Sequence, residues 1–164
     1  MIVEFSDFKR EAKIPDLFPE IGTDDFVNTA TQEALQEFID EYERKYLLQF
    51  FGKRKQAYIL LREFSYYLEF PEDDKKMTRL IKSLKTIIPN FIAWYWFRNE
   101  SVQNTGIGAV IPQGENSNRT NNVDRMVFIW NEMVDKTRVL YKEHFDTHLI
   151  PERDIFLKIN AFGI

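Results

Sequence analysis

A long polar segment interrupts the helical pattern of this chain and constrains its fold more than any other feature. The chain is densely aromatic over residues 90–97, and it then continues through residues 102–122 with glycines and without helical periodicity. Loops of this length are uncommon inside a small domain unless they bind something or are disordered. We therefore expect a helical body with a projecting arm, which suits an assembly subunit better than an enzyme.

The length and the aromatic content bound the kind of domain that can form. A chain of 164 residues is most simply one domain, and such a domain buries about 70% of the surface that its unfolded chain exposes. Aromatic residues make up 15% of the chain, more than a small helical core requires. Because aromatic side chains also dominate interfaces, part of this set is expected to face a partner. For the block at residues 94–97 we prefer core and subunit contact to base stacking.

The charge and the missing cysteines exclude several classes of protein. The chain has no cysteine, which excludes disulfides, thiolate metal sites and a cysteine nucleophile. A net charge of −4 argues against general nucleic-acid binding, which requires a basic face. The first residues carry acidic side chains and no long apolar run, and no segment reaches the length of a membrane span. We expect a soluble protein that is made in the cytoplasm and has no membrane partner.

Two helices are predicted in the first half of the chain from the spacing of apolar residues. Thr29 and Gln32 have the spacing of a capping box, and the helix that they introduce should end near Gly52. A second helix is expected from about residue 53 to residue 68. Its predicted apolar face comprises Ala57, Tyr58, Leu61, Phe64, Ser65 and Leu68.

Two further helices are predicted in the second half of the chain. The third follows Pro71 and a cluster of acidic residues that favours a helix start, and Pro89 should kink or interrupt it. The fourth should be capped by Asn122 or Asp124 and should end near His144. The predicted stripes are Met77, Leu80, Ile81, Leu84, Ile87 and Ile88 in the third helix, and Met126, Val127, Trp130, Met133, Val134 and Tyr141 in the fourth.

These elements together predict a mostly α fold. Residues 1–28 form an irregular lead-in, residues 29–145 form a body resembling a four-helix bundle, and residues 146–164 form an extended tail. The arm at residues 102–122 is a loop or hairpin that projects from the body.

The arm has the composition of an interaction segment. Gly106 and Gly108 permit positive φ or close backbone approach, and the β-prone Val110 follows them. A hairpin, or a strand added to a neighbour's edge, would use both features, and a disordered surface loop is the alternative. The expected interface residues in the arm are Asn104, Thr105, Gly106, Ile107, Gly108 and Val110.

The C-terminal tail is too apolar to remain free in water. Its apolar residues alternate with others over residues 155–160, which indicates an extended segment. The tail must be covered by its own bundle or by a partner, and the alternation favours strand addition to another chain or to the arm. The expected interface residues in the tail are Ile155, Phe156, Leu157, Ile159 and Phe162.

No motif in the chain predicts catalysis. His144 and His148 stand four residues apart, as two ligands of a metal-dependent hydrolase would on a helix, but the glutamate that follows the first histidine in zinc proteases is missing. A solvated helix end with partly positive histidines is the preferred interpretation. Asp40 and Glu43 are expected on a solvated acidic face. We expect no catalytic, cofactor-binding or metal-binding residues, and no enzyme activity.

Three segments resemble those of a known family. They are KYLLQFFGKRKQAYILLREF at residues 45–64, IAWYWFRNESVQNTGIGAV at residues 92–110, and DRMVFIWNEMV at residues 124–134. In this order, the pattern resembles the head–tail connector, or portal adaptor, proteins of tailed bacteriophages, in the form carried by phages and prophages of Bacteroides-type bacteria. The resemblance covers roughly residues 30 to 142.

The resemblance implies a structural virion protein of the neck, assembled in the host bacterial cytoplasm. Such subunits form a ring, typically a dodecamer, that docks under the portal protein and binds other neck or tail proteins. They are helical, have no catalytic residues, and let the genome DNA pass through the lumen without specific binding. The acidic residues 69 and 72–74 are candidates for a non-adhesive lumen. The alternative is a small helical adaptor or regulator that binds another protein.

Overall fold

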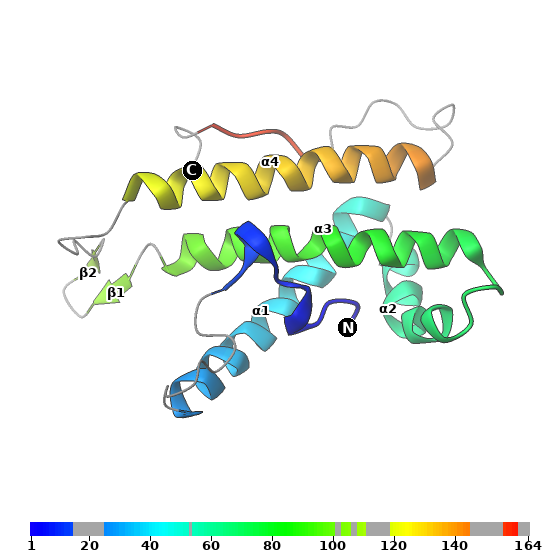
Figure 1. Cartoon of the computed structure of the whole chain (residues 1–164), viewed down its shortest axis with the longest axis horizontal. Helices are drawn as coiled ribbons and strands as arrows, with labels where there is room; N and C mark the ends of the chain where they lie inside the picture. Colours follow the sequence, from blue (N-terminus) through cyan, green and yellow to red (C-terminus); the bar gives the residue numbers. More distant parts are fainter. Residues whose placement is uncertain are drawn as a thin grey trace.

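Four helices form the body of the molecule, as predicted. The computed structural model describes residues 1–14, 25–52, 54–100, 103–105, 108–110, 119–144 and 156–160. The helices are α1 (Asp25–Phe51), α2 (Arg54–Glu69), α3 (Lys75–Glu100) and α4 (Arg119–His144). In Figure 1, α3 and α4 lie side by side, α1 crosses them obliquely, and α2 packs at one end, with α3 between α2 and α4. The mostly α, bundle-like fold class is therefore confirmed.

The ends of α1 and α4 show how local signals set helix boundaries. Gly52 follows α1 with a φ of 63°, and its N–H donates to the carbonyl of Leu48 at 3.0 Å. This is the left-handed cap for which glycine is preferred. The end of α4 at His144 was also predicted correctly. Both helices begin earlier than predicted, α1 at Asp25 and α4 at Arg119. Helix α1 therefore reaches into the segment that was expected to be irregular.

The predicted interruption at Pro89 is wrong, because α3 continues through this residue to Glu100. Proline removes one hydrogen bond of the helical ladder and crowds the preceding turn. Here the residues on both sides are locked in the core, with Ile88 and Phe91 each 0% exposed. Packing over the whole length of α3 therefore outweighs the local preference of Pro89.

The inner face of α2 differs in part from the prediction. Tyr58 and Ser65 were expected on it and are exposed, whereas Leu60 is buried and Tyr67 packs against the core. Apolar residues lie on both sides of the residues that the predicted and the observed inner face share. The apolar spacing therefore does not decide which side of the helix turns toward the core. In α4, buried Ile129 and Thr137 join the predicted stripe.

The N-terminal lead-in belongs to the core, which the sequence pattern did not indicate. It contains two short 3-10 helices, η1 (Phe5–Asp7) and η2 (Arg10–Ala12). Five of its apolar side chains are almost completely buried: Ile2, Val3, Phe8, Ala12 and Ile14.

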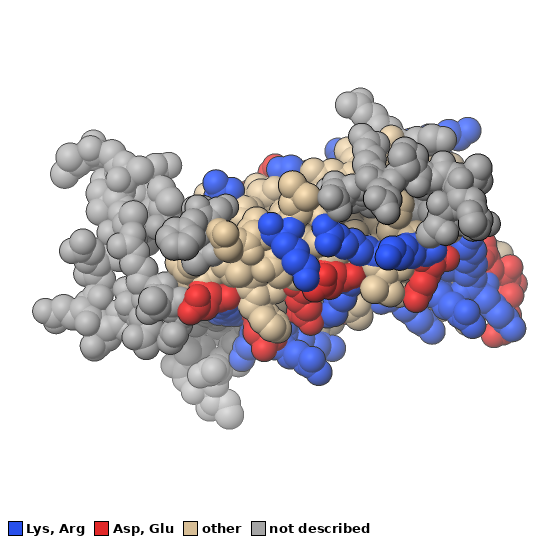
Figure 2. All heavy atoms as spheres, turned by 90° about the horizontal axis from the view of Figure 1, so that it is seen from above, with Lys and Arg blue, Asp and Glu red and all other residues tan. Residues whose placement is uncertain are grey.

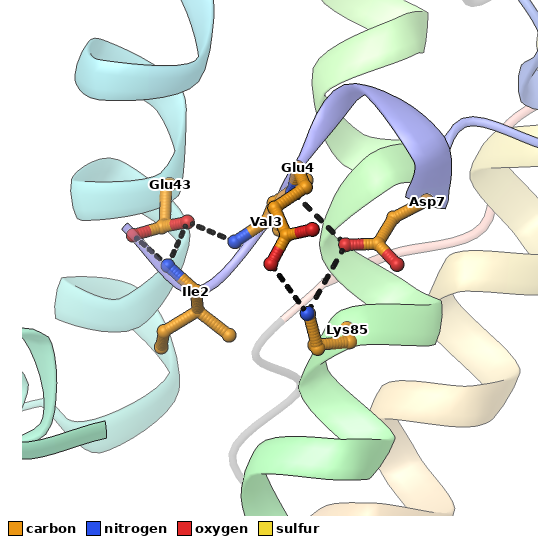
Figure 3. Close-up of polar contacts among 6 residues, drawn as sticks. All are labelled: Ile2, Val3, Glu4, Asp7, Glu43 and Lys85. Carbon is orange, nitrogen blue, oxygen red and sulfur yellow. Dashed lines mark hydrogen bonds and ion pairs between the residues drawn. The ribbon is translucent and has the colours of Figure 1, made fainter. Parts of the chain in front are cut away.

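A buried carboxylate on α1 holds the first residues of the lead-in (Figure 3). Glu43 is 1% exposed, and its oxygens accept the N–H of Ile2 at 2.9 and 3.1 Å and the N–H of Val3 at 2.9 Å. Our expectation of a solvated acidic face is therefore wrong for Glu43. An extended segment without a strand partner leaves its N–H groups unpaired, and a buried acceptor satisfies them.

Two basic side chains hold the rest of the lead-in. The Nζ of Lys85 on α3 lies 3.1 Å from a carboxylate oxygen of Glu4 and 3.7 Å from one of Asp7 (Figure 3). Arg125 on α4 donates to the backbone carbonyls of Glu11 and Lys13. The lead-in thus connects α1, α3 and α4.

Replacing Glu43 by alanine should lower the free energy of unfolding by about 1–3 kcal/mol, because buried N–H groups lose their acceptor. Glu41→Ala, two residues away on the exposed side of α1, is the matched control and should change stability by less than about 0.5 kcal/mol. Chemical denaturation measures both variants. Equal stabilities of the Glu43→Ala and Glu41→Ala variants would show that the hydrogen bonds from Ile2 and Val3 to Glu43 contribute nothing.

The buried carboxyl group of Glu43 should also make the stability of the chain depend on pH. Burial raises the pKa of Glu43, and the hydrogen bonds from Val3 and Ile2 oppose this effect. The folded chain then holds this proton more tightly than the unfolded chain does. The resulting stabilisation is present below the ordinary carboxyl pKa and is lost as the pH rises through the raised pKa. The stability of the native chain relative to the Glu43→Gln variant should therefore fall as the pH rises above about 4. A difference that is constant with pH would contradict this.

Candidate interaction surfaces

The outer side of α2 carries the densest exposed apolar surface in the described part of the chain. Four of the eight exposed large hydrophobic residues there lie on α2 or directly after it. They are Tyr58, Ile59, Tyr66 and Phe70, which are 36–50% exposed. Single exposed apolar side chains are ordinary, but a contiguous set indicates an interaction site.

One stripe of α2 faces directly away from the core. It consists of Lys55, Ile59, Arg62, Tyr66 and, just beyond the helix, Phe70; we call it the α2 stripe. The rings of Tyr66 and Phe70 lie 5.1 Å apart, and the Tyr66 hydroxyl donates to Asp73 at 2.5 Å. Tyrosine and arginine are the residue types that contribute most at protein interfaces, so the stripe has the composition of a docking surface.

A second stripe runs along α4, with Asn131 half-buried against the tail and the other members exposed. It consists of Asp124, Phe128, Asn131, Asp135 and Val139; we call it the α4 stripe. Phe128 is 52% exposed and Val139 57% exposed. A groove of about 470 Å³ follows the first part of this stripe, lined by Asp124, Val127, Phe128, Asn131, Glu132 and Asp135. The α4 stripe is therefore apolar at two points and acidic between and beside them.

The acidic groups of this groove are partly compensated. Burial disfavours the charge on Glu132, but hydrogen bonds from Lys136 and Asn90 outweigh that effect and lower its pKa. Asp135 pairs with Lys158 of the tail at 2.8 Å. Figure 2, which views the molecule from above Figure 1, shows basic and acidic side chains interspersed with residues of other types.

The arm contains the predicted hairpin. Strands β1 (Gln103–Thr105) and β2 (Gly108–Val110) are antiparallel, with Asn104 opposite Ala109 and Thr105 opposite Gly108. Figure 1 places the strands beyond the ends of α3 and α4. Asn104, Thr105, Gly108 and Val110 are thus in the hairpin, while Gly106 and Ile107 lie outside the described residues. That the arm contacts a neighbour stays a prediction.

The structure places the tail residue Phe156 in the chain's own core. Phe156 is 6% exposed, and its ring lies 5.5 Å from Tyr46, 5.6 Å from Phe91 and 6.0 Å from Trp130. Leu157, by contrast, is 63% exposed. Phe156 therefore contacts its own bundle rather than a partner. The expected interface residues Ile155 and Phe162 lie outside the described residues.

The described part of the tail after Phe156 forms neither helix nor strand and pairs with side chains of α4. The side-chain amide of Asn131 donates to the carbonyl of Ile159 at 2.9 Å and accepts the N–H of Ile159 at 2.9 Å. Trp130 Nε1 donates to the carbonyl of Leu157 at 2.7 Å. A single side chain thus gives the tail the two hydrogen bonds that a neighbouring strand would give.

The aromatic block of α3 belongs to the core. Trp94, Trp96 and Phe97 are 5–8% exposed. The ring of Trp94 lies 4.6 Å from that of Trp130, and the ring of Trp96 lies 5.1 Å from that of Phe38. These contacts occupy the rings inside the chain, so the core part of the prediction is confirmed.

His144 packs against the end of α1, at 6.3 Å from the ring of Phe50 and 6.0 Å from that of Phe51. Burial lowers the pKa of His144, nearby Lys76 adds to this effect, and Asp74 opposes it. Burial therefore favours the neutral form of His144, which differs from the partly positive histidine expected at this helix end. His148 lies outside the described residues, and among the described ones no group of three metal-ligating side chains occurs.

The acidic residues at the joint between α2 and α3 are mixed with basic ones. Glu72 pairs with Lys75 at 2.8 Å, and Asp74 accepts the N–H of Met77 at 2.9 Å, which caps α3. These carboxylates thus have structural partners, and their placement in a lumen stays a prediction.

Comparisons of the chain with protein-family models, with curated proteins and with solved structures found no match. In the part of the chain that the structure describes, no helix is both long and apolar enough to cross a membrane.

Replacing Phe156 by alanine should lower the free energy of unfolding by about 3 kcal/mol, because the variant leaves a cavity between aromatic rings of three helices. Leu157→Ala, at the adjacent exposed position, is the control and should change stability by less than about 0.5 kcal/mol. Thermal and denaturant unfolding measure both. If Phe156→Ala matches the control, the tail is not part of the core in solution.

Proposed function

We propose that the chain is a subunit of a ring that joins the portal and capsid to the tail of a tailed bacteriophage. The observation that carries the proposal is the presence of two different surfaces with exposed apolar side chains, on α2 and on α4, in one small helical body. A ring built from identical subunits uses head-to-tail interfaces, in which each subunit offers two unlike surfaces. The resemblance of residues 45–64, 92–110 and 124–134 to connector proteins supports the specific role.

The ring needs only modest contacts from each subunit. Closure of a ring makes the later contacts intramolecular, so their effective concentration is high and weak interfaces combine into a stable assembly. The hairpin of β1 and β2 lies beyond the helical body and is suited to reach the portal or a neighbour. The proposed partners are the portal protein, other copies of the chain, and further neck or tail proteins.

The charge of the chain suits passage of DNA. Strong phosphate binding requires clusters of lysine and arginine and would retard DNA that must slide through a lumen. The net charge is −4, and acidic and basic side chains are interspersed on the face shown in Figure 2. The proposal assigns no catalytic, cofactor-binding or metal-binding residue.

A helical adaptor is the second candidate, and the composition of the α2 stripe favours it. An adaptor needs only one docking surface, and the exposed Tyr66, Arg62 and Phe70 supply one on α2. Mass measurement of the complex separates the two: an adaptor forms a small complex of fixed stoichiometry, whereas a connector subunit forms a closed ring.

Co-expression with the portal protein of the same phage tests the proposal. The full chain should co-purify with the portal ring at a mass that corresponds to a closed ring of subunits. Deleting residues 106–118 should reduce this association by at least about tenfold, because each subunit then loses one of its contacts and the avidity of the assembly falls.

Far-ultraviolet circular dichroism is the control for that deletion, and it should show native helix content. Failure of the full chain to bind the portal ring would reject the connector role. Undiminished binding after the deletion would reject the role of the arm.

A further inference from the structure

The outer side of α2 makes its polar contacts within α2 itself and the turn that follows it. Arg62 pairs with the neighbouring Glu63 at 2.5 Å, and the Tyr66 hydroxyl donates to Asp73 at 2.5 Å. The Arg62 side chain is nevertheless 76% exposed, and in the described part of the chain Glu69 has no ion-pair partner. The α2 stripe and the exposed carboxylate beside it therefore offer both apolar and charged groups to a partner.

Apolar and charged side chains lie on opposite sides of this surface. Ile59 and Phe70 are eleven positions apart, which is close to three turns at about 3.6 residues per turn. The helical ladder continues to Phe70, whose N–H donates to the carbonyl of Tyr66 at 2.8 Å. Arg62 and Glu69 are seven positions apart, which is close to two turns. The apolar pair thus lies along one side of α2, the charged pair along the other, and Tyr66 between them.

This pattern is self-complementary when two copies of α2 pack antiparallel. In a pair related by a twofold axis every contact occurs twice, and the same side of each helix faces its counterpart. Placing Ile59 opposite Phe70 of the second copy puts the axis midway between residues 64 and 65. Arg62 is then offset by only about 3 Å along the helix from Glu69 of the second copy, within reach of its side chain. Apolar groups meet apolar groups, and cations meet carboxylates, on both sides of the axis.

Tyr66 occupies the centre of this arrangement. It lies one and a half positions from the axis, so the two copies of Tyr66 are offset by about 4.5 Å along the helices. At this distance the two aromatic rings can pack against each other. The ring is already held by Phe70, at 5.1 Å, and by the hydrogen bond to Asp73, so docking costs little side-chain entropy.

A parallel pair of α2 helices is poorer. It places Lys55, Arg62 and Glu69 each against the same residue of the second copy, and like charges across an interface disfavour it. The outer side of α4 is already occupied in part by the tail, through Asn131 and Asp135. The antiparallel pair of α2 helices is therefore the contact that the exposed charges favour.

We propose that two copies of the chain associate through an antiparallel contact between their α2 helices, with the two Tyr66 side chains at the twofold axis. Helix α2 lies at one end of the body (Figure 1). One helix from each copy gives a small interface, below about 1,200 Å² in total, so the association is weak and reversible. A contact with twofold symmetry closes after two copies and builds no ring. The pair therefore goes beyond the proposed ring and is a further state of the free chain.

Engineered cysteines test this contact, because the chain has no cysteine of its own. Tyr66→Cys should form a disulfide-linked dimer under mild oxidation of the full chain at high concentration, because its two copies meet at the axis. Lys55→Cys, on the same stripe, is the matched control. Its two copies lie about 29 Å apart along an antiparallel pair, beyond the reach of a disulfide, whereas a parallel pair would join them.

The relative amounts of covalent dimer decide the result. More dimer from Tyr66→Cys than from Lys55→Cys supports the antiparallel pair. Equal amounts show collisions without a defined contact, and more dimer from Lys55→Cys shows a parallel pair. Either of these two results overturns the proposal.

Charge exchange in the cysteine-free chain gives an independent measurement and keeps Tyr66 in place. Arg62→Glu and Glu69→Arg should each weaken self-association by about four- to twentyfold, because each dimer contains two exposed ion pairs. The double variant should recover most of the loss, since it restores both pairs in reverse. Lys82→Glu, an exposed lysine on α3, is the control and should leave the dissociation constant unchanged.

Sedimentation equilibrium at up to about 1 mM protein measures these monomer–dimer equilibria. A native chain that stays monomeric over this range, or a double variant that associates more weakly than either single variant, contradicts the pair. A covalent Tyr66→Cys dimer without binding of the full chain to the portal ring keeps the pair and rejects the connector role. Binding to the portal ring by a chain that is monomeric when free rejects the pair and leaves the connector role in place.

Discussion

The ring of Phe91 is the contact on which the arrangement of the helices depends. It is 0% exposed, and it lies 5.4 Å from Tyr46 on α1, 5.9 Å from Trp130 on α4 and 5.6 Å from Phe156 of the tail. One side chain of α3 thus touches two other helices and the tail. Aromatic rings pack in preferred edge-to-face and offset geometries, so such a cluster orients helices as well as burying area. It also explains how α3 continues through Pro89, which lies next to this cluster.

Two extended segments are attached to this core by the same device. The lead-in gives its N–H groups to Glu43, and the tail exchanges two hydrogen bonds with Asn131. Arg125 adds donors to the carbonyls of the lead-in. Backbone groups of a lone extended segment need partners once they are covered, and here side chains of α1 and α4 replace the missing strand. The helices therefore carry the segments in defined positions.

In the described part of the molecule this attachment leaves the outer side of α2 uncovered, whereas the tail lies against part of α4. Apolar side chains that a helix exposes along one outer face lose the stabilisation that burial would give, unless a partner covers them. In the proposed ring, neighbouring subunits or the portal protein would cover such a surface.

The sequence by itself determined the mostly α class, the four helices, the end of α1 before Gly52 and the end of α4 at His144, and it offered the hairpin in the arm as one of several alternatives. These features follow from apolar spacing, glycine and capping residues, which act over a few neighbouring residues. Only the tertiary structure decided the burial of Glu43 and of the lead-in, the continuity of α3 through Pro89, the inner edge of α2 and the place of Phe156. Each of these depends on a partner far away in the chain. The energy of such a contact appears only when distant elements meet, so local patterns carry no trace of it.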